Sequence, residues 1–143
     1  MSTYFDASAM VKLLLVEEGS ATAGRLWAQA AEPFVSIVGY AELRGSVARA
    51  ARGGRIARDD YPTARLELER MWGTLATIRL DGRLARLAGS LADRHALTAL
   101  DAIHLASALS LREPGEDVAF VTFDRRLREA ALAEGLTVLP EVV

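Results

Sequence analysis

The sequence predicts an α/β sandwich in which helices cover a mostly parallel central sheet of four to five short strands. Short β-branched and aromatic runs alternate along the chain with longer segments that carry apolar residues at helical spacing. This alternation is typical of parallel sheets. No repeat, low-complexity tract or Pro/Ser-rich linker interrupts the chain, so residues 1–143 are expected to form a single domain.

The first half of the chain is expected to contain two strands and four helices. A short strand at residues 3–5 precedes a helix with Val11, Leu14 and Leu15 on its apolar side. Ser20 is a favoured N-cap for a second helix that extends through Trp27. A β-branched and aromatic strand at 33–37 precedes a helix at 39–51, which the following glycine pair ends. Another helix begins near Asp59 or Asp60 and runs to Trp72.

The second half is expected to contain three strands and three helices. After a strand at 77–80, Asp81 caps a helix that reaches His95, and Thr98 caps one that runs through Leu111. The Glu-Pro-Gly sequence at 113–115 breaks the chain. Residues 118–122 form the clearest buried strand, Asp124 opens a helix that ends at Gly135, and a strand at 137–139 follows.

Composition narrows the function classes. The chain has no cysteine, which suits a reducing compartment, and its first residues lack the basic and apolar segments of a signal peptide. We therefore expect a cytoplasmic protein with no membrane segment. The net charge of −2 gives no global attraction to nucleic acid, so any such binding requires a local patch. Lys12 is the only lysine among 17 basic residues, and arginine suits phosphate recognition.

Four carboxylates stand out by position. Asp6 and Asp124 follow two of the expected strands, and the carboxyl ends of parallel strands are where sites gather. Glu42 and Asp101 interrupt otherwise apolar helix segments, where an uncompensated charge is costly. A divalent cation would relieve the mutual repulsion of such a cluster, and ligands that are all oxygen favour Mg²⁺ or Mn²⁺ over zinc.

Each acid also has a purely structural interpretation. Asp6 and Asp124 are favoured helix N-caps, and Asp101 lies near a helix start, where negative charge is stabilising. Glu42 could pair with Arg44. A structural role could explain any one of these acids. It explains all four together poorly, because the expected fold gives no evident reason for an acid at Glu42 or Asp101.

The chain resembles the VapC-type PIN-domain ribonucleases along nearly its whole length. Four short segments carry the resemblance, in family order and spacing: Tyr-Phe-Asp-Ala-Ser-Ala, Tyr-Ala-Glu-Leu, Leu-Asp-Ala-Ile-His-Leu-Ala-Ser-Ala-Leu and Val-Thr-Phe-Asp-Arg-Arg-Leu. Each motif is weak alone. Together they imply a PIN-like α/β/α sandwich and a metal-dependent endoribonuclease that leaves a 5′-phosphate and a 3′-hydroxyl.

The resemblance also implies roles for individual residues. It places Asp6, Glu42, Asp101 and Asp124 in a catalytic pocket around Mg²⁺ or Mn²⁺. Asp6 and Asp101 are expected as direct metal ligands, with Asp124 a third ligand that, like Glu42, acts partly through water. Ser8 and Thr122 are expected to support the pocket through their hydroxyls. The partners implied are an RNA substrate, a second copy in a homodimer and a cognate VapB-type antitoxin. The groove for that antitoxin is expected near residues 13–15 and Trp27.

Other residues have weaker interpretations. His104, three residues after Asp101, could support the pocket, but we expect a semi-buried helix histidine, and solvent and the helix dipole account for His95. A run of arginines follows Glu42 and forms either an RNA-binding stripe or a solvated face: Arg44, Arg49, Arg52, Arg55 and Arg58.

Four rival functions remain to be weighed. An aspartyl phosphatase would need a second acid where Ser8 stands, and a phosphoacceptor receiver would need paired acids after the first strand and a late lysine. A PIN-domain nuclease in housekeeping RNA processing and a catalytically silent PIN-like module remain as alternatives. The presence of all four acids counts against the silent module.

Overall fold

A five-stranded sheet, parallel throughout, forms the centre of the computed structural model, which describes residues 1–141. The strands lie in the order β3-β2-β1-β4-β5. Their bounds are β1 Ser2–Phe5, β2 Pro33–Ser36, β3 Ala76–Ile78, β4 Val118–Val121 and β5 Thr137–Leu139. The predicted α/β class is confirmed, and the sheet is wholly parallel where we expected it to be mostly so.

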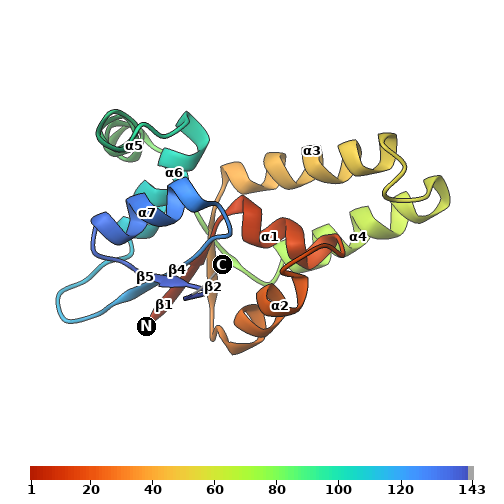
Figure 1. The fold of residues 1–143 in the computed structure, drawn as a ribbon, viewed down its shortest axis with the longest axis horizontal. Helices are drawn as coiled ribbons and strands as arrows, with labels where there is room; N and C mark the ends of the chain where they lie inside the picture. The colour runs from red at the N-terminus through yellow and green to blue at the C-terminus, as the bar shows by residue number, and fades with distance from the viewer. Residues whose placement is uncertain (142–143) are drawn as a thin grey trace.

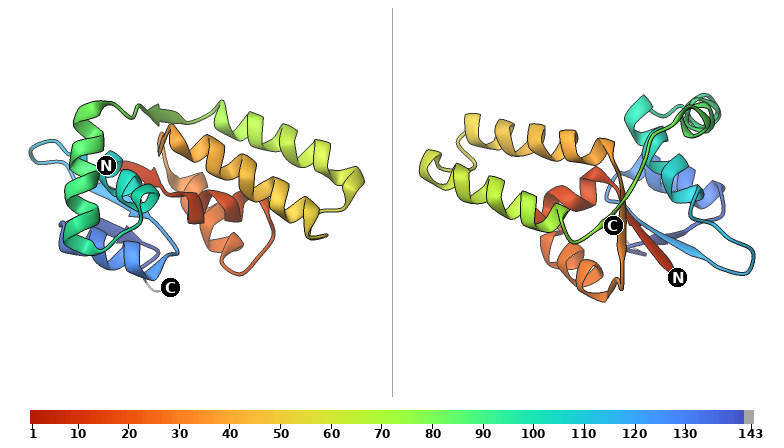
Figure 2. Two further views of the ribbon diagram at one scale, coloured as in Figure 1. Left: turned by 90° about the horizontal axis from the view of Figure 1, so that it is seen from above. Right: turned by 180° about the vertical axis from the view of Figure 1, so that it is seen from behind.

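Within residues 1–141, seven α-helices flank the sheet, four on one face and three on the other (Figures 1 and 2). The first group is α1 Ala7–Leu14, α2 Ser20–Gln29, α3 Val38–Arg52 and α4 Tyr61–Trp72, and the second is α5 Gly82–His95, α6 Ala99–Leu109 and α7 Arg125–Ala133. The helices α3 and α4 lie side by side and project well beyond the sheet as an arm (Figure 1). None of the helices described within residues 1–141 is long and apolar enough to cross a membrane.

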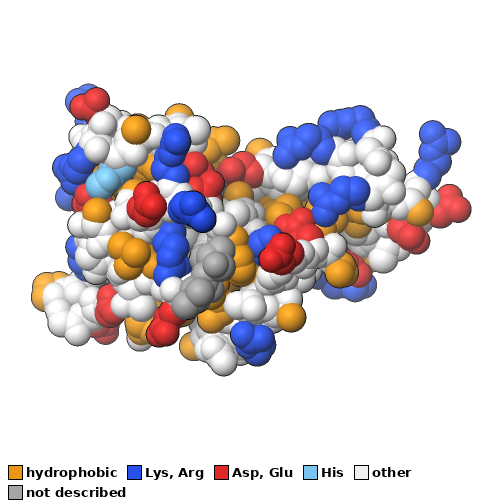
Figure 3. Space-filling view, in the orientation of Figure 1, with side chains coloured by type: hydrophobic (Ala, Val, Ile, Leu, Met, Phe, Trp, Pro, Cys, Tyr) orange, Lys and Arg blue, Asp and Glu red, His pale blue; other side chains and the backbone are white. Residues whose placement is uncertain are grey.

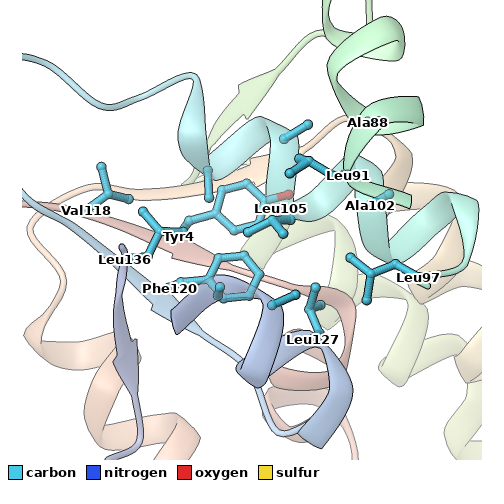
Figure 4. Close-up of a cluster of buried hydrophobic side chains, with 14 of the residues drawn as sticks. Tyr4, Ala88, Leu91, Leu97, Ala102, Leu105, Val118, Phe120, Leu127 and Leu136 are labelled. Atoms are coloured by element: carbon cyan, nitrogen blue, oxygen red, sulfur yellow. The ribbon is translucent and has the colours of Figure 1, made fainter. Parts of the chain in front are cut away.

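Two apolar clusters hold the layers together because side chains alternate along each strand. Tyr4 of β1 and its register partner Phe120 of β4 face α5, α6 and α7, and their rings stack with centroids 5.5 Å apart (Figure 4). The next residue of β1, Phe5, points to the opposite cluster beneath α1, α3 and α4, as does its partner Val121. Both clusters meet at β1 and β4, so these two strands are the most constrained part of the sheet.

Most predicted caps are present. The side chains of Asp6, Asp81, Thr98 and Asp124 each accept a hydrogen bond from the first turn of the helix that follows. The predicted cap at Ser20 is wrong: Ser20 is already helical, and the cap position belongs to Gly19, whose φ of +91° suits glycine. The Ser20 hydroxyl instead donates to the Leu15 carbonyl.

The remaining element boundaries differ from the predictions by small amounts. A 3₁₀ turn at Arg58–Asp60 precedes α4, and Asp60 gives that helix no side-chain capping bond. The strands predicted at 33–37, 77–80 and 118–122 are each one residue shorter, and the second of them begins one residue earlier. The helices predicted to end at Leu111 and Gly135 end two residues earlier. The capping carboxylates Asp6 and Asp124 follow β1 and β4. Because these two strands are paired and parallel, both residues lie at the same edge of the sheet.

Candidate active site at the carboxyl ends of β1 and β4

Asp6 is the most enclosed acid of the site, with only 2% of its surface exposed. Its Oδ1 accepts hydrogen bonds from the Ser8 hydroxyl at 2.7 Å and from the Ala9 amide at 2.9 Å. Its Oδ2 accepts from the Thr122 hydroxyl at 2.6 Å. Burial raises the pKa of Asp6, while the nearby His104 and these three hydrogen bonds offset part of the rise. The carboxylate is thus held in one orientation from both strand ends.

The two hydroxyls that hold Asp6 also bind the opposite loop. Ser8 Oγ accepts a hydrogen bond from the Phe123 amide at 3.0 Å, and Thr122 Oγ1 accepts one from the Asp124 amide at 3.1 Å. Each hydroxyl therefore donates to Asp6 and accepts from the segment that leads into α7. This arrangement places Asp124 beside Asp6, and one oxygen of Asp124 caps α7 at 2.9 Å from the Leu127 amide.

Asp101 and Glu42 approach the same place from α6 and α3. Asp101 is in the first turn of α6 and is partly buried. Burial raises the pKa of Asp101, and the negative charges of Asp124 and Glu42 raise it further. Asp6 and Asp124 thus follow the paired strands β1 and β4, and Asp101 and Glu42 approach from α6 and α3, where the charges of Asp124 and Glu42 act on Asp101.

His104 is where the sequence-based expectation was wrong. The residue is fully buried, and its Nε2 lies 2.6 Å from Glu42 Oε1, while its Nδ1 lies 2.6 Å from the Tyr4 hydroxyl. The spacing of three residues from Asp101 was the available signal, since it places both on one side of the helix. Tyr4 gave only the weaker signal of an inward-facing aromatic two residues before Asp6.

The other structural interpretations fare differently. Glu42 does not pair with Arg44, because Arg44 donates to the Tyr40 hydroxyl at 2.8 Å and lies 3.8 Å from Glu69. His95 pairs with Glu134 at 2.6 Å, so solvent and the helix dipole alone do not account for it. Leu13, Leu14 and Trp27 pack against the core beneath α1, α3 and α4, and Leu15 is buried.

A cleft of about 690 Å³ opens beside the acids, between α1, α3 and the start of α6. Its apolar walls include Val11, Val38 and Leu100, with Ser8 and Glu42 also lining it. Arg49, two turns beyond Glu42 on the same face of α3, completes the lining. Figure 3 shows acidic side chains gathered between α3 and the part of the molecule formed by α5, α6 and α7, with basic side chains along the arm.

The predicted arginine stripe divides among several surfaces. Arg49 lines the cleft beside the acids, whereas Arg52 and Arg58 line a separate hollow with Tyr61. Arg55 pairs with Glu17 at 3.0 Å. With Arg44 bound to Tyr40, Arg49 is the member of the run placed on the wall of the cleft that holds Glu42.

The donors of the site fit a hard divalent cation in chemistry, although they are not drawn into a complete ligand shell. Their oxygens come from four carboxylates, and the mutual repulsion at Asp101 is what a bound cation would relieve. Within residues 1–141, no three Asp, Glu, His or Cys groups converge closely enough to form a full metal-binding set. Mg²⁺ commonly keeps several waters and binds through one or two carboxylates, so a partial set of this type suits it.

The PIN domain family model matches residues 3–132. The chain belongs to the PIN-domain family. Ribonuclease VapC45 and ribonuclease VapC49 of Mycobacterium tuberculosis are each 41% identical to it over 137 residues, which cover 96% of this chain and 94% of each relative. The predicted resemblance is confirmed: this is a PIN domain of the VapC type.

Solved structures have the same fold at lower sequence identity. PAE2754 from Pyrobaculum aerophilum superposes with a TM-score of 0.71 at 21% identity and covers 96% of this chain and 89% of its own. M. tuberculosis VapC20, described as a Sarcin-Ricin loop cleaving toxin, has a TM-score of 0.67 at 20% identity over 94% and 96% of the two chains. VapBC2 from Rickettsia felis, bound to promoter DNA, has a TM-score of 0.67 at 14% identity and covers 96% of this chain and 97% of its own. The PIN-like fold expected from the sequence is thereby confirmed.

The repulsion at Asp101 predicts how D101N changes stability with pH. Because the pKa of Asp101 is raised in the folded state, the folded protein binds more protons than the unfolded chain once the pH rises above about 3.9, the ordinary value for aspartate. As the pH rises above this value, the free energy of unfolding of the wild type falls. D101N has a neutral amide at this position, so it does not lose this stability. In metal-free buffer, D101N should melt at a higher temperature than the wild type at pH 7, and the difference should shrink as the pH falls toward that value.

Thermal unfolding followed by circular dichroism across this pH range measures the effect. The matched control is D93N, which changes an exposed aspartate on α5. A D101N protein that is less stable than the wild type at neutral pH would contradict the crowding of acids at this site.

Proposed function

We propose that this PIN domain is a metal-dependent endoribonuclease and the toxin of a VapBC-type toxin–antitoxin pair. The observation that carries the proposal is the placement of Asp6 and Asp124 after the paired strands β1 and β4, with Asp101 close enough to Asp124 and Glu42 for their charges to raise its pKa. The names of its relatives support the substrate class, since VapC45 and VapC49 are named ribonucleases. We propose that residues 1–143 act as one domain in the cytoplasm.

We propose that Asp6, Asp101 and Asp124 hold Mg²⁺ or Mn²⁺. A divalent cation so held would polarise the scissile phosphate and make a nearby water more acidic. Asp6 suits the central position because its own orientation is fixed by three hydrogen bonds. Ser8 and Thr122 support the site because each hydroxyl hydrogen-bonds both to Asp6 and to a backbone amide of the segment that leads into α7.

The chain's own carboxylates would handle the proton of the attacking water. Water attacks phosphorus in line, the bond from phosphorus to the 3′-oxygen breaks, and Glu42 or Asp124 accepts the proton that the water loses. The products are a 5′-phosphate and a 3′-hydroxyl, the latter after the departing oxygen takes up a proton. No covalent nucleophile and no RNA 2′-hydroxyl are required.

The cleft beside Glu42 is proposed as the path of the RNA strand. Its apolar walls can accept an unstacked base, and Arg49 at the far end can bind a backbone phosphate. With this placement, the attraction of a protein of net charge −2 to RNA would be local, on the arm formed by α3 and α4. Among the arginines predicted to bind RNA, we propose Arg49 as the main contact. Arg44, Arg52 and Arg55 remain proposed as peripheral contacts.

The acids beside this cleft support a proposed antitoxin partner. A negatively charged pocket attracts a basic side chain, and a disordered antitoxin segment could fold across it on binding. The similarity to the fold of R. felis VapBC2 agrees with this role. We further propose that the toxin is a homodimer. Because Leu13, Leu14 and Trp27 pack against the core and Leu15 is buried, the cleft between α1 and α3 is the better candidate for the antitoxin groove.

A matched pair of cap variants tests the nuclease. D6N and D81N each replace a capping aspartate by asparagine, which is an equally good cap, so both should keep the fold. Only Asp6 belongs to the acidic cluster. D6N should lower the rate of RNA cleavage in Mg²⁺ or Mn²⁺ by about 100-fold or more, whereas D81N should cleave like the wild type.

Cleavage of a structured RNA, with melting curves for both variants, checks this. Addition of a chelator should also stop cleavage by the wild type. Wild-type rates in D6N, or full activity in the chelator, would remove the acidic cluster or the cation from the mechanism.

The phosphate contact predicts the salt dependence of RNA binding. R49A should weaken binding and reduce the slope of log K against log salt by about one, because one phosphate contact is lost. R70A is the matched control, since Arg70 is an exposed arginine in the last turn of α4. The measurement is fluorescence anisotropy with a cleavage-resistant RNA at several salt concentrations. Equal slopes for R49A and the wild type would show that Arg49 contacts solvent and no RNA phosphate.

The toxin role predicts growth arrest in cells. Induction of the wild-type chain should slow growth, D6N should not, and co-expression of the gene encoded next to it should restore growth. The readout is optical density after induction, beside co-purification of the neighbour's product. If D6N is inactive in vitro as predicted but the wild type is harmless in cells, a housekeeping role in RNA processing becomes the better assignment.

A further inference from the structure

A chain of hydrogen bonds runs from the acidic cleft into the apolar interior. Glu42 Oε1 lies 2.6 Å from His104 Nε2, and His104 Nδ1 lies 2.6 Å from the Tyr4 hydroxyl. The Tyr4 hydroxyl in turn accepts a hydrogen bond from the Ser36 amide at 2.9 Å. These residues come from α3, α6, β1 and β2, and all but Glu42 are fully buried.

The direction of each bond follows from the number of protons available. The Ser36 amide donates to the Tyr4 hydroxyl, and a tyrosine hydroxyl, with an ordinary pKa of about 10, keeps its own proton at neutral pH. That proton is available to His104 Nδ1, which then acts as an acceptor. A neutral imidazole that accepts at Nδ1 carries its single proton at Nε2, and Nε2 faces Glu42.

We propose that His104 is a positioning residue that, as the Nε2–H tautomer set by Tyr4, donates to Glu42 and aims the second oxygen of that carboxylate at the cleft. This inference rests on the nuclease function proposed above. It extends that function, because it assigns a role to a buried pair, Tyr4 and His104, on the far side of Glu42 from the substrate.

The packing around Tyr4 makes the chain a rigid support. The Tyr4 ring stacks on Phe120 with an interplanar angle of 4° and meets the His104 ring edge-on at 5.9 Å. Glu42, by contrast, lies on the α3 arm and lines the open cleft, where a free glutamate would sample many rotamers. Partners behind a reacting group typically change its activity by about 10- to 100-fold when they are lost.

Two substitutions at one position separate the hydrogen bond from the packing. H104L fills much of the same space but has no donor, so it should lower kcat about 10- to 100-fold with little change in KM. H104Q keeps an amide donor where Nε2 stood and an acceptor for Tyr4, so it should recover much of that loss. Equal losses in H104L and H104Q would overturn the proposal.

A double-mutant cycle with E42A gives a readout that a general structural defect would not produce. If His104 acts only through Glu42, H104L should reduce the single-turnover rate of the wild type but leave the residual rate of E42A unchanged. A second drop of similar size in E42A would show that His104 has a purely structural role, and this would contradict the proposal.

Imidazole nitrogen shifts test the tautomer without any nuclease assay and without a variant at His104. The chain has only two histidines, so H95Q assigns the spectrum of His104 by difference. We expect a protonated Nε2 and an unprotonated Nδ1 at neutral pH in wild-type protein. In Y4F, the Nδ1 resonance should move because its donor is gone. A Nδ1–H tautomer or a doubly protonated ring in the wild type would overturn the assignment.

Different results would contradict the nuclease function and the positioning role of His104. If the wild type cleaves no RNA, the proposed function is wrong. The nitrogen shifts still test the tautomer of His104, because they do not depend on cleavage. If the wild type cleaves RNA and H104L matches it, the nuclease stands and the positioning role is wrong.

Discussion

The need to stabilise one buried carboxylate, that of Asp6, organises this end of the molecule. A carboxylate with 2% of its surface exposed requires several donors, and they come from Ser8, Ala9 and Thr122. Thr122 follows β4 and Ser8 lies in α1. Their hydrogen bonds to Asp6 therefore hold the segment after β1 against the segment after β4. The same bonds begin α1 and orient the entry to α7, so the acid proposed as the central metal ligand also helps to determine where two helices start.

The two apolar clusters make this corner rigid enough to hold a reactive site. Tyr4 and Phe5, adjacent in β1, bury their rings on opposite faces of the sheet, so β1 is packed from both sides. The helices α3 and α4 extend away from this centre as an arm (Figure 1). Glu42 lies at the base of the arm and Arg49 farther along it, and this separates the acidic centre from the basic surface. An overall acidic chain can therefore present a local basic surface for RNA.

The acids could be selected from the sequence because their positions follow from simple rules. Parallel strands end at one edge of a sheet, so Asp6 and Asp124 were expected at the same edge, and the Thr122 hydroxyl links the Asp6 carboxylate to the Asp124 amide there. The structural and chemical interpretations of these residues proved to be compatible, since each caps a helix with one oxygen. The capping signal alone therefore could not distinguish a site residue from Asp81, which caps α5 in the same way.

What the sequence determined by itself was local and periodic: the α/β class, the order of elements, most helix caps and the four acids of the PIN domain. What only the tertiary structure decided was which side chains meet across long separations. Tyr4 and His104 are 100 residues apart and lie on different elements, and no local pattern indicates that one phenol will face one imidazole. The division of the arginines also depends on the packing of α3 against α4 and α1. Periodicity determines which face of a helix a residue occupies, but only the fold determines what that face meets.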